Sequence, residues 1–462
     1  MRLLLLLTLA AVAAALPAPA SAVAQDTVPG QVVVQYDAGA SSADQQAAQQ
    51  ASGAAPIAAP AAQIQVLQVA PGSSVSETAA QLRSQPGVRY AVPNVVAHAS
   101  AFVPNDRGKT RFGAGWQQTQ WNFLSPAGVD APGAWANLIA AGAPGGAGVT
   151  VAVLDTGVAY EDRGRFRRSP DLAPTSFASP RDLVSRDAHP DDLNGHGTFV
   201  ASVIAERTNN GFGVTGLAYG ARIMPVRVLD SQGLGDAATI AAGVRYAAAH
   251  GARVLNLSLE FDSSVPASQI PEVLSALRYA KRKGVLAVAA SGNESLRSIA
   301  YPARANDVLS VGATTEHLCQ ADYSNDGPGL DLVAPGGGAD ADIPSDPAHC
   351  RPDDRAGHDI FQVTFAGSVR RFGLPGGYEG TSMASPHVAA VAALIIASGV
   401  IGRRPSPDAV EARLKATARD LGAPGADRVY GAGLVNAAAA TTPSLALAGR
   451  WKRAAAKRRI PH

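Results

Sequence analysis

Three short motifs contain the side chains that acyl transfer by a serine requires. Asp155 ends the apolar run VAVLD, His196 stands between two glycines in NGHGT, and Ser382 opens the long apolar segment SMASPHVAAVAALIIAS. A serine hydroxyl becomes a nucleophile when an imidazole takes its proton, and a carboxylate fixes the imidazole tautomer and stabilises its charged form. The chain order Asp, His, Ser is one of several unrelated orders in which this chemistry recurs.

The segment that follows Ser382 has the pattern of a buried helix closed by Gly399. Pro386 is expected in the first turn of this helix, where a missing N–H group costs nothing. Ser382 would then lie where free N–H groups and the positive end of the helix dipole gather. That position suits a reaction in which an oxyanion develops.

Each motif also has an ordinary structural interpretation. A serine in this position can simply cap a helix. An Asp-Thr-Gly sequence after a strand can be a turn, and a histidine between glycines can serve packing alone. The presence of all three motifs, each in its expected strand or helix setting, favours the catalytic interpretation.

Apolar strands alternate with helical patterns around these motifs, which predicts an α/β fold with a parallel sheet covered on both faces. In such sheets functional groups gather at the carboxyl ends of the strands, and Asp155, Ser258 and Asn293 fall at or just past such ends. The expected strands lie in 148–157, 221–230, 252–259, 284–293 and 307–314, and the expected helices in 198–206, 236–251 and 272–284.

Residues 1–24 have the layout of a secretory signal peptide. One positive charge is followed by an apolar run from Leu3 to Leu16 and then by small residues, with Ala22 and Ala24 as candidate cleavage positions. The apolar run is too short to span a bilayer. We therefore expect an exported protein.

A small module is expected next, over 25–99. Apolar strand patterns are predicted at 31–36 and 63–69, and Ser74 with Glu77 forms a capping-box signature at the start of a helix. A polar, glycine-bearing connector follows at 100–120. The chain pattern then changes to the α/β pattern described above, over 121–440.

The composition fits a soluble globular protein of more than one unit, with 47% hydrophobic residues and a net charge of +2. Nothing in it indicates a nucleic acid partner, and we expect a monomer. The segment 441–462 is basic and is interpreted as a solvated end, with weak contact to an anionic cell surface as the alternative. Because an exported chain meets oxidising conditions, Cys319 and Cys350 are expected to pair.

The motifs around Asp155, His196 and Ser382 resemble those of the subtilisin-like serine proteases, the subtilases. The resemblance covers roughly 120–440 and implies a three-layer α/β/α domain with a mainly parallel sheet of about seven strands. The preceding module resembles the small α+β, ferredoxin-like inhibitory propeptide of that family. The resemblance therefore implies a secreted endopeptidase that is made as a zymogen, cuts itself and acts on proteins and peptides.

The resemblance also implies individual roles. Asp155 matches the orienting carboxylate, His196 the general base and Ser382 the nucleophile, while Asn293 in AASGNE matches the oxyanion donor. The segment NLSLE matches the strand that pairs with the substrate backbone, with Glu260 in place of the family's glycine. The expected substrate-binding residues are Ser258, Leu259, Glu260, Ala290, Gly292 and Ala300.

Two hints about specificity disagree. Ala300 would be a small apolar floor that accepts apolar side chains, whereas the carboxylate of Glu260 would narrow the cleft or favour basic ones. Phe199 is a further departure, because the family often has histidine there.

Four acids crowd the approach to His196, namely Asp182, Asp187, Asp191 and Asp192. Many subtilases hold structural calcium with such oxygens. A cluster without a defined ligand spacing is more often a solvated loop, so we assign no metal, and the chemistry requires no cofactor. The alternative to an active protease is an inactive relative that keeps the fold as a binding or scaffold protein.

Overall fold

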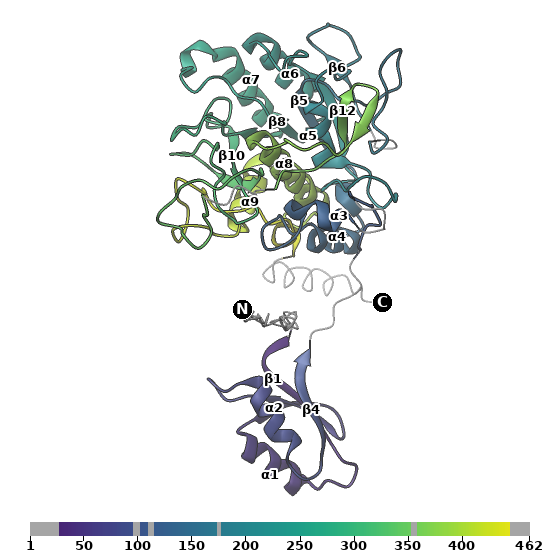
Figure 1. Ribbon diagram of the computed structural model, residues 1–462, viewed down its shortest axis with the longest axis vertical. Coiled ribbons are helices and arrows are strands. Elements are labelled where there is room, and N and C mark those ends of the chain that lie inside the picture. Colours follow the sequence, from purple (N-terminus) through teal and green to yellow (C-terminus); the bar gives the residue numbers. More distant parts are fainter. Residues whose placement is uncertain (1–26, 96–101, 110–114, 173–176, 353–357, 444–462) are drawn as a thin grey trace, which may run out of the picture. The chain divides into compact units, whose positions relative to one another are not determined.

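The computed structural model describes residues 27–95, 102–109, 115–172, 177–352 and 358–443. These residues divide between two compact units, Met1–Ser100 and Ala101–His462, which are described separately (Figure 1). The predicted signal peptide and the segment from 444 onward lie outside the described residues.

The smaller unit is an antiparallel sheet with two helices. Its strand order is β2-β3-β1-β4, and its core contains Val32, Val34, Leu67 and Leu82. This βαββαβ arrangement confirms the predicted small α+β, ferredoxin-like module. Its elements are β1 Thr27–Tyr36, α1 Ser42–Ser52, β2 Ala55–Ala61, β3 Ile64–Gln68, α2 Val75–Arg83 and β4 Val88–Val95.

Helix α1 was not predicted, because its Ala- and Gln-rich sequence has no strong apolar period. A complete capping box starts it, in which Ser41 and Asp44 satisfy each other's backbone N–H groups, and Gly53 ends it in the left-handed region. At α2, Ser74 accepts from the Glu77 N–H at 3.3 Å, which is one half of the predicted capping box.

The larger unit is built on a seven-stranded sheet with order β11-β10-β9-β8-β5-β7-β6, in which all neighbouring strands are parallel. This confirms the predicted sheet. Its strands are β5 Thr150–Asp155, β6 Arg181–Asp182, β7 Arg222–Arg227, β8 Val254–Leu257, β9 Leu286–Ala290, β10 Val308–Thr314 and β11 Leu332–Pro335.

Helices cover both faces of this sheet, as Figure 1 shows. Successive residues of β5 alternate between two hydrophobic clusters: Val151 and Val153 face the cluster of α4, α5 and α8, while Ala152 and Leu154 face that of α6 and α7. The helices are α3 Trp116–Thr119, α4 Ala131–Ala140, α5 His196–Ala205, α6 Ala237–Ala249, α7 Pro271–Arg282, α8 Thr381–Ser398, α9 Pro407–Ala416 and α10 Ala437–Thr441.

Helix α8 is the central helix of the larger unit. Within the described residues, α8 is the one helix long and apolar enough to cross a membrane. However, 83% of its 18 residues are buried inside the protein, so α8 is a core helix. The expectation for Pro386 was wrong, because α8 begins at Thr381 and the proline lies inside the helix, in its second turn.

Two segments beside the sheet differ from simple connectors. Residues 102–109 and 115–120 belong to the larger unit, where Trp116 is fully buried and its indole N–H donates to the Pro104 carbonyl at 2.9 Å. The segment 336–377 before α8, called the insertion below because it is longer than expected for the family, carries the hairpin β12 Thr364–Ser368 and β13 Arg371–Gly373. The predicted disulfide between Cys319 and Cys350 is confirmed and ties this insertion to the chain after β10.

Candidate active site

Asp155 and His196 meet at the carboxyl end of β5. The carboxylate of Asp155 is fully buried, and its Oδ1 lies 2.8 Å from the His196 Nδ1. The backbone N–H of Thr156 also donates to this Oδ1, at 2.7 Å. These contacts direct the other ring nitrogen of His196, Nε2, away from Asp155.

Glycines on both sides of His196 are required by close packing. A side chain at Gly197 would collide with the Gly157 carbonyl oxygen and approach Asp155, so the helix could not come near enough for the hydrogen bond to His196. Gly195 has a φ of 105°, in the left-handed region that favours glycine. The two glycines therefore allow His196 to begin α5 directly against β5.

The surroundings of His196 act on its pKa in opposite directions. Burial lowers the pKa, while the charge and hydrogen bond of Asp155 and the charge of Asp192 raise it. The net effect raises the pKa above the ordinary histidine value. The effects of Asp155 and Asp192 together outweigh burial, because neighbouring carboxylates stabilise the imidazolium that forms when the ring accepts a proton.

Ser382 is the second residue of α8, and its backbone carbonyl is hydrogen-bonded by Ser258, the residue that follows β8. Since Pro386 has no N–H group, the Ser382 carbonyl lacks its usual partner four residues along the helix. The Ser258 hydroxyl donates to this carbonyl instead, at 2.8 Å. Asn256 Nδ2 donates to the Ser258 hydroxyl, and Ser385 donates to Asn256 Oδ1, each at 2.9 Å.

Asn293 lies just past β9 and its side-chain amide is held in one orientation. Its Oδ1 accepts from the backbone N–H and the hydroxyl of Thr381, at 2.8 and 3.0 Å. The Gly292 N–H in turn donates to the Thr381 hydroxyl at 3.3 Å. With Oδ1 engaged in this way, the Nδ2 group of Asn293 is the end of the amide left to donate elsewhere.

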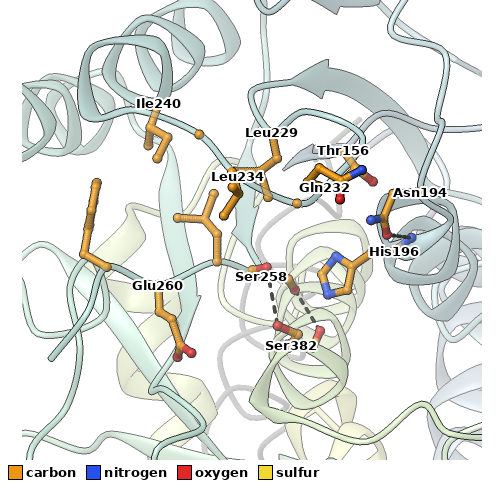
Figure 2. Close-up of a pocket in the computed structure, with 14 residues that line it drawn as sticks. Thr156, Asn194, His196, Leu229, Gln232, Leu234, Ile240, Ser258, Glu260 and Ser382 are labelled. Carbon is orange, nitrogen blue, oxygen red and sulfur yellow. Dashed lines mark hydrogen bonds between the residues drawn. The ribbon is translucent and has the colours of Figure 1, made fainter.

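His196 and Ser382 both line a cleft of about 400 Å³. In Figure 2 the His196 ring faces Ser382. The side chains of Leu229, Leu234 and Ile240 form an apolar group on the side of Ser258 that is away from Ser382. Of the expected substrate-binding residues, Ser258, Leu259 and Glu260 line this cleft. Ala290, Gly292 and Ala300 are not among its described lining residues, and Ala290 and Ala300 are each 1% exposed.

The four acids near His196 are each engaged by protein donors. Asp182 pairs with Arg227 at 2.9 Å, Asp191 forms a close ion pair with Arg163, and Asp187 accepts from the His189 N–H at 2.8 Å. Asp192 accepts from several groups, including the hydroxyls of Thr156 and Thr198. Across the described residues, no group of three or more His, Cys, Asp or Glu side chains is arranged to hold a metal ion.

Several residues of the site escaped the sequence analysis. Thr381 was assigned no role, although its hydroxyl donates to Asn293 Oδ1. Tyr378, directly after the insertion, stacks on Phe199 of α5 with ring centroids 4.1 Å apart. Leu234 is 68% exposed in the cleft. In the sequence, Phe199 differed from the histidine that the family often has at this position. The structure gives a physical reason for a phenylalanine there, because its ring stacks on Tyr378.

Comparisons with known proteins agree with this geometry. The subtilase family model matches residues 146–433, and the fervidolysin N-terminal prodomain model matches residues 13–94. The chain is 40% identical to subtilisin Savinase from Lederbergia lenta over 298 residues, which cover 64% of this chain and 91% of that protein. It is 38% identical to the cell wall-associated protease of Bacillus subtilis (strain 168) over 274 residues, 59% of this chain and 26% of that protein.

Among solved structures, proteases from Pseudoalteromonas arctica PAMC 21717 resemble this chain with a TM-score of 0.58 and 30% identity. That match covers 74% of this chain and 99% of the other. The residues matched by the family model include β5, α5 and α8, which carry Asp155, His196 and Ser382. The chain therefore belongs to the subtilase family and is a subtilisin-like serine protease with an N-terminal prodomain.

Proposed function

We propose that the protein is a secreted serine endopeptidase in which Ser382 attacks the scissile carbonyl, His196 is the general base and Asp155 orients His196. The carrying observation is the 2.8 Å contact between Asp155 Oδ1 and His196 Nδ1, in a cleft that His196 shares with Ser382. A fixed Nδ1–H leaves Nε2 free to take the proton from the serine hydroxyl.

The reaction proceeds through an acyl-enzyme. His196 accepts the proton of Ser382 as the hydroxyl oxygen bonds to the carbonyl carbon, and it then delivers that proton to the leaving amine. A water molecule then attacks the acyl-enzyme carbonyl while His196 takes its proton, and the ester bond to Ser382 breaks to release the carboxylic acid. The charged imidazole formed in each half is stabilised by the buried carboxylate of Asp155.

The oxyanion of each tetrahedral intermediate is held by the Nδ2 group of Asn293 and the backbone N–H of Ser382. The orientation of Asn293 by Thr381 supports this role, because the donor is fixed before substrate arrives. The substrate backbone pairs as an added strand along Ser258, Leu259 and Glu260, which continue from β8 into the cleft.

The N-terminal prodomain blocks the cleft and is removed by the protein's own active site. The prodomain family match and the separate compact fold of this unit support this proposal. Export through the signal sequence in 1–24 then yields a free or envelope-associated protease, and the basic segment 441–462 adds weak contact with an anionic surface. One similar protease is named as cell wall-associated.

The test is the intact mass and N-terminal sequence of the secreted protein, wild type beside Ser382→Ala. The wild type should lose the signal and the prodomain, with a cut between Ala97 and Trp121, and should react with a fluorophosphonate probe. The variant should keep the prodomain and fail to react. Equal processing of both proteins would assign the cut to another protease, and failure of the wild type to react would favour the inactive-relative alternative.

A further inference from the structure

A carboxylate lies beside the backbone of the oxyanion segment. Glu260 follows Ser258 and Leu259 at the edge of the cleft, and its side chain extends away from the apolar group of Leu229, Leu234 and Ile240 (Figure 2). Its Oε2 would lie 3.0 Å from a Cβ placed on Gly292. Glu260 therefore bridges the space between the 258–260 segment and the 290–293 segment.

That space is where the specificity-determining side chain of a substrate would enter. A substrate strand paired along 258–260 presents its scissile carbonyl to Ser382 and Asn293. The substrate residue that contributes this carbonyl then directs its side chain between the 258–260 and 290–293 segments, because these segments flank Asn293, the proposed oxyanion donor. Glu260 would meet the outer part of this side chain.

Among the residues that the structure describes, no cation pairs with the carboxylate of Glu260. Its Oε2 is buried without a hydrogen-bond partner, and within the described residues neither Glu260 nor its neighbour Glu294 is ion-paired with a lysine or arginine. Burial raises the pKa of Glu260, the charge of Glu294 raises it further, and donation from Asn293 lowers it. A buried, ionised carboxylate without a partner carries a desolvation cost in free energy, which a positively charged group beside it offsets.

The walls around the carboxylate suit the stem of a long side chain. Gly292 carries no side chain beside the Glu260 carboxylate, and the buried, apolar Leu259 precedes Glu260 in the lining of the cleft. Lysine and arginine combine an apolar stem with a charged end, so they can contact small apolar surfaces and a carboxylate together. Of the two specificity hints, the structure supports that of Glu260, which lines the cleft, whereas Ala300 is not among its described lining residues.

We propose that Glu260 makes the protease selective for peptides with lysine or arginine at the residue whose carbonyl Ser382 attacks. Glu294 contributes a second negative charge near the same position, held by donors from Ser263 and Asn325. The inference rests on the proposed function and names the substrate class of that same site.

The experiment compares kcat/KM for peptides that differ only at this residue, with lysine, arginine, glutamine, leucine or phenylalanine. The processed enzyme is first titrated with a fluorophosphonate, so that active sites are counted independently of the peptides. The wild type should prefer lysine or arginine over leucine by about tenfold or more, the scale of a close charge pair in a desolvated site.

Two variants remove the carboxylate in different ways. Glu260→Gln keeps the shape and Glu260→Ala removes most of the side chain, and each should lower the ratio of kcat/KM for lysine over leucine by about tenfold or more. Glu272→Gln, which removes one charge at the start of α7, should leave this ratio at the wild-type value. Because the readout is a ratio within one enzyme, loss of folded protein does not imitate the effect.

The outcomes separate this inference from the proposed function. An enzyme that reacts with the probe but cleaves leucine and phenylalanine peptides as fast as basic ones overturns the role of Glu260 alone. A basic preference that survives in both Glu260 variants also overturns it. A wild type that neither reacts with the probe nor cleaves any peptide overturns the proposed function, and this inference falls with it.

Discussion

The hydroxyl of Ser258 donates a 2.8 Å hydrogen bond to the backbone carbonyl oxygen of Ser382. The contact fills a gap in the hydrogen bonding of α8, because Pro386 has no N–H group to offer that carbonyl. It also ties the end of β8, along which we place the substrate strand, to the residue that we propose as nucleophile. The Ser382 hydroxyl in turn donates to the Ser258 carbonyl at 3.4 Å, so two hydrogen bonds join the proposed substrate-binding segment to the proposed nucleophile.

Ser258→Ala should weaken both stability and catalysis. The change leaves the Ser382 carbonyl without a donor and Asn256 Nδ2 without its acceptor. We expect the free energy of unfolding to fall by about 1–3 kcal/mol, the cost of an unsatisfied buried group. Urea unfolding of the fluorophosphonate-inhibited enzyme measures this, and kcat should fall with it. Ser264→Ala, which removes an exposed hydroxyl bonded to Asp262, is the control, and an equal loss in both variants would contradict the prediction.

Thr381→Val should lower kcat by misorienting Asn293. The variant keeps the backbone N–H that donates to Asn293 Oδ1 and loses the hydroxyl that donates to the same atom. We expect a fall in kcat smaller than the roughly 10²–10³-fold loss typical of removing an oxyanion donor, which Asn293→Ala should show. Thr381→Ser should restore the rate. A Thr381→Val enzyme with wild-type kcat would show that the hydroxyl does not orient the amide.

The sheet edge that carries the site was predictable from local patterns. Asp155, Ser258 and Asn293 each follow an apolar run, and the carboxyl ends of neighbouring parallel strands meet at one edge. The structure places Asp155 at the last residue of β5, Ser258 just after β8 and Asn293 just after β9, and these three strands are adjacent in the strand order. Periodicity and topology sufficed here, because all three positions depend on backbone direction alone.

Side-chain contacts between distant segments were not predictable in the same way. The stack of Phe199 on Tyr378 joins α5 to the residue directly after the insertion, far along the chain, and neither residue has a local pattern that names its partner. The place of Pro386 was misjudged for a related reason. A glycine and two hydroxyls make several helix starts acceptable, and the sequence alone does not show that the Ser258 hydroxyl bonds to the carbonyl that Pro386 leaves without a donor.

The pKa of His196 should appear in the pH dependence of kcat/KM. The proposed mechanism needs neutral His196, so activity should fall as pH drops through this pKa. Because Asp155 and Asp192 raise the pKa against the opposing effect of burial, the midpoint should lie above the ordinary value of 6.5. The measurement uses a leucine peptide without ionisable groups, so that titration of Glu260 does not alter substrate binding. A midpoint at or below 6.5 would contradict this account.

Tyr378→Ala should loosen the helix that begins with His196. The Tyr378 ring is stacked on the buried Phe199 at an interplanar angle of 5°, and the insertion before it donates from the Thr364 hydroxyl to the Gly195 carbonyl at 2.7 Å. Losing the ring should reduce the free energy of unfolding by about 2–3 kcal/mol, since the contacts of a partly buried ring with the buried Phe199 are lost. Tyr378→Phe keeps the ring and should retain most of this stability. A similar loss in both variants would assign the effect to the hydroxyl instead.

Asp171 and Glu206 should make stability fall as pH rises. Burial is the main cause that raises the pKa of each carboxyl, and the charge of Asp106 adds to it; the pKa of Asp171 is raised to about 8. Arg207 is the nearby cation, and its charge lowers the pKa of Asp106. Because the folded protein holds these protons to higher pH than the unfolded chain, their contribution is complete below the unfolded pKa of about 4 and is lost up to about pH 8.

The corresponding measurement is the free energy of unfolding of the inhibited enzyme from pH 5 to 8, in excess chelator. For each proton that only the folded state retains, the free energy of unfolding should fall by up to about 1.4 kcal/mol per pH unit as pH rises. Glu206→Gln keeps a neutral side chain in place and should flatten the slope. Calcium in place of chelator tests a bound cation, because a cation beside these carboxylates would stabilise their charged forms and reverse the slope. A slope of zero in chelator would show that the carboxyls titrate alike in both states.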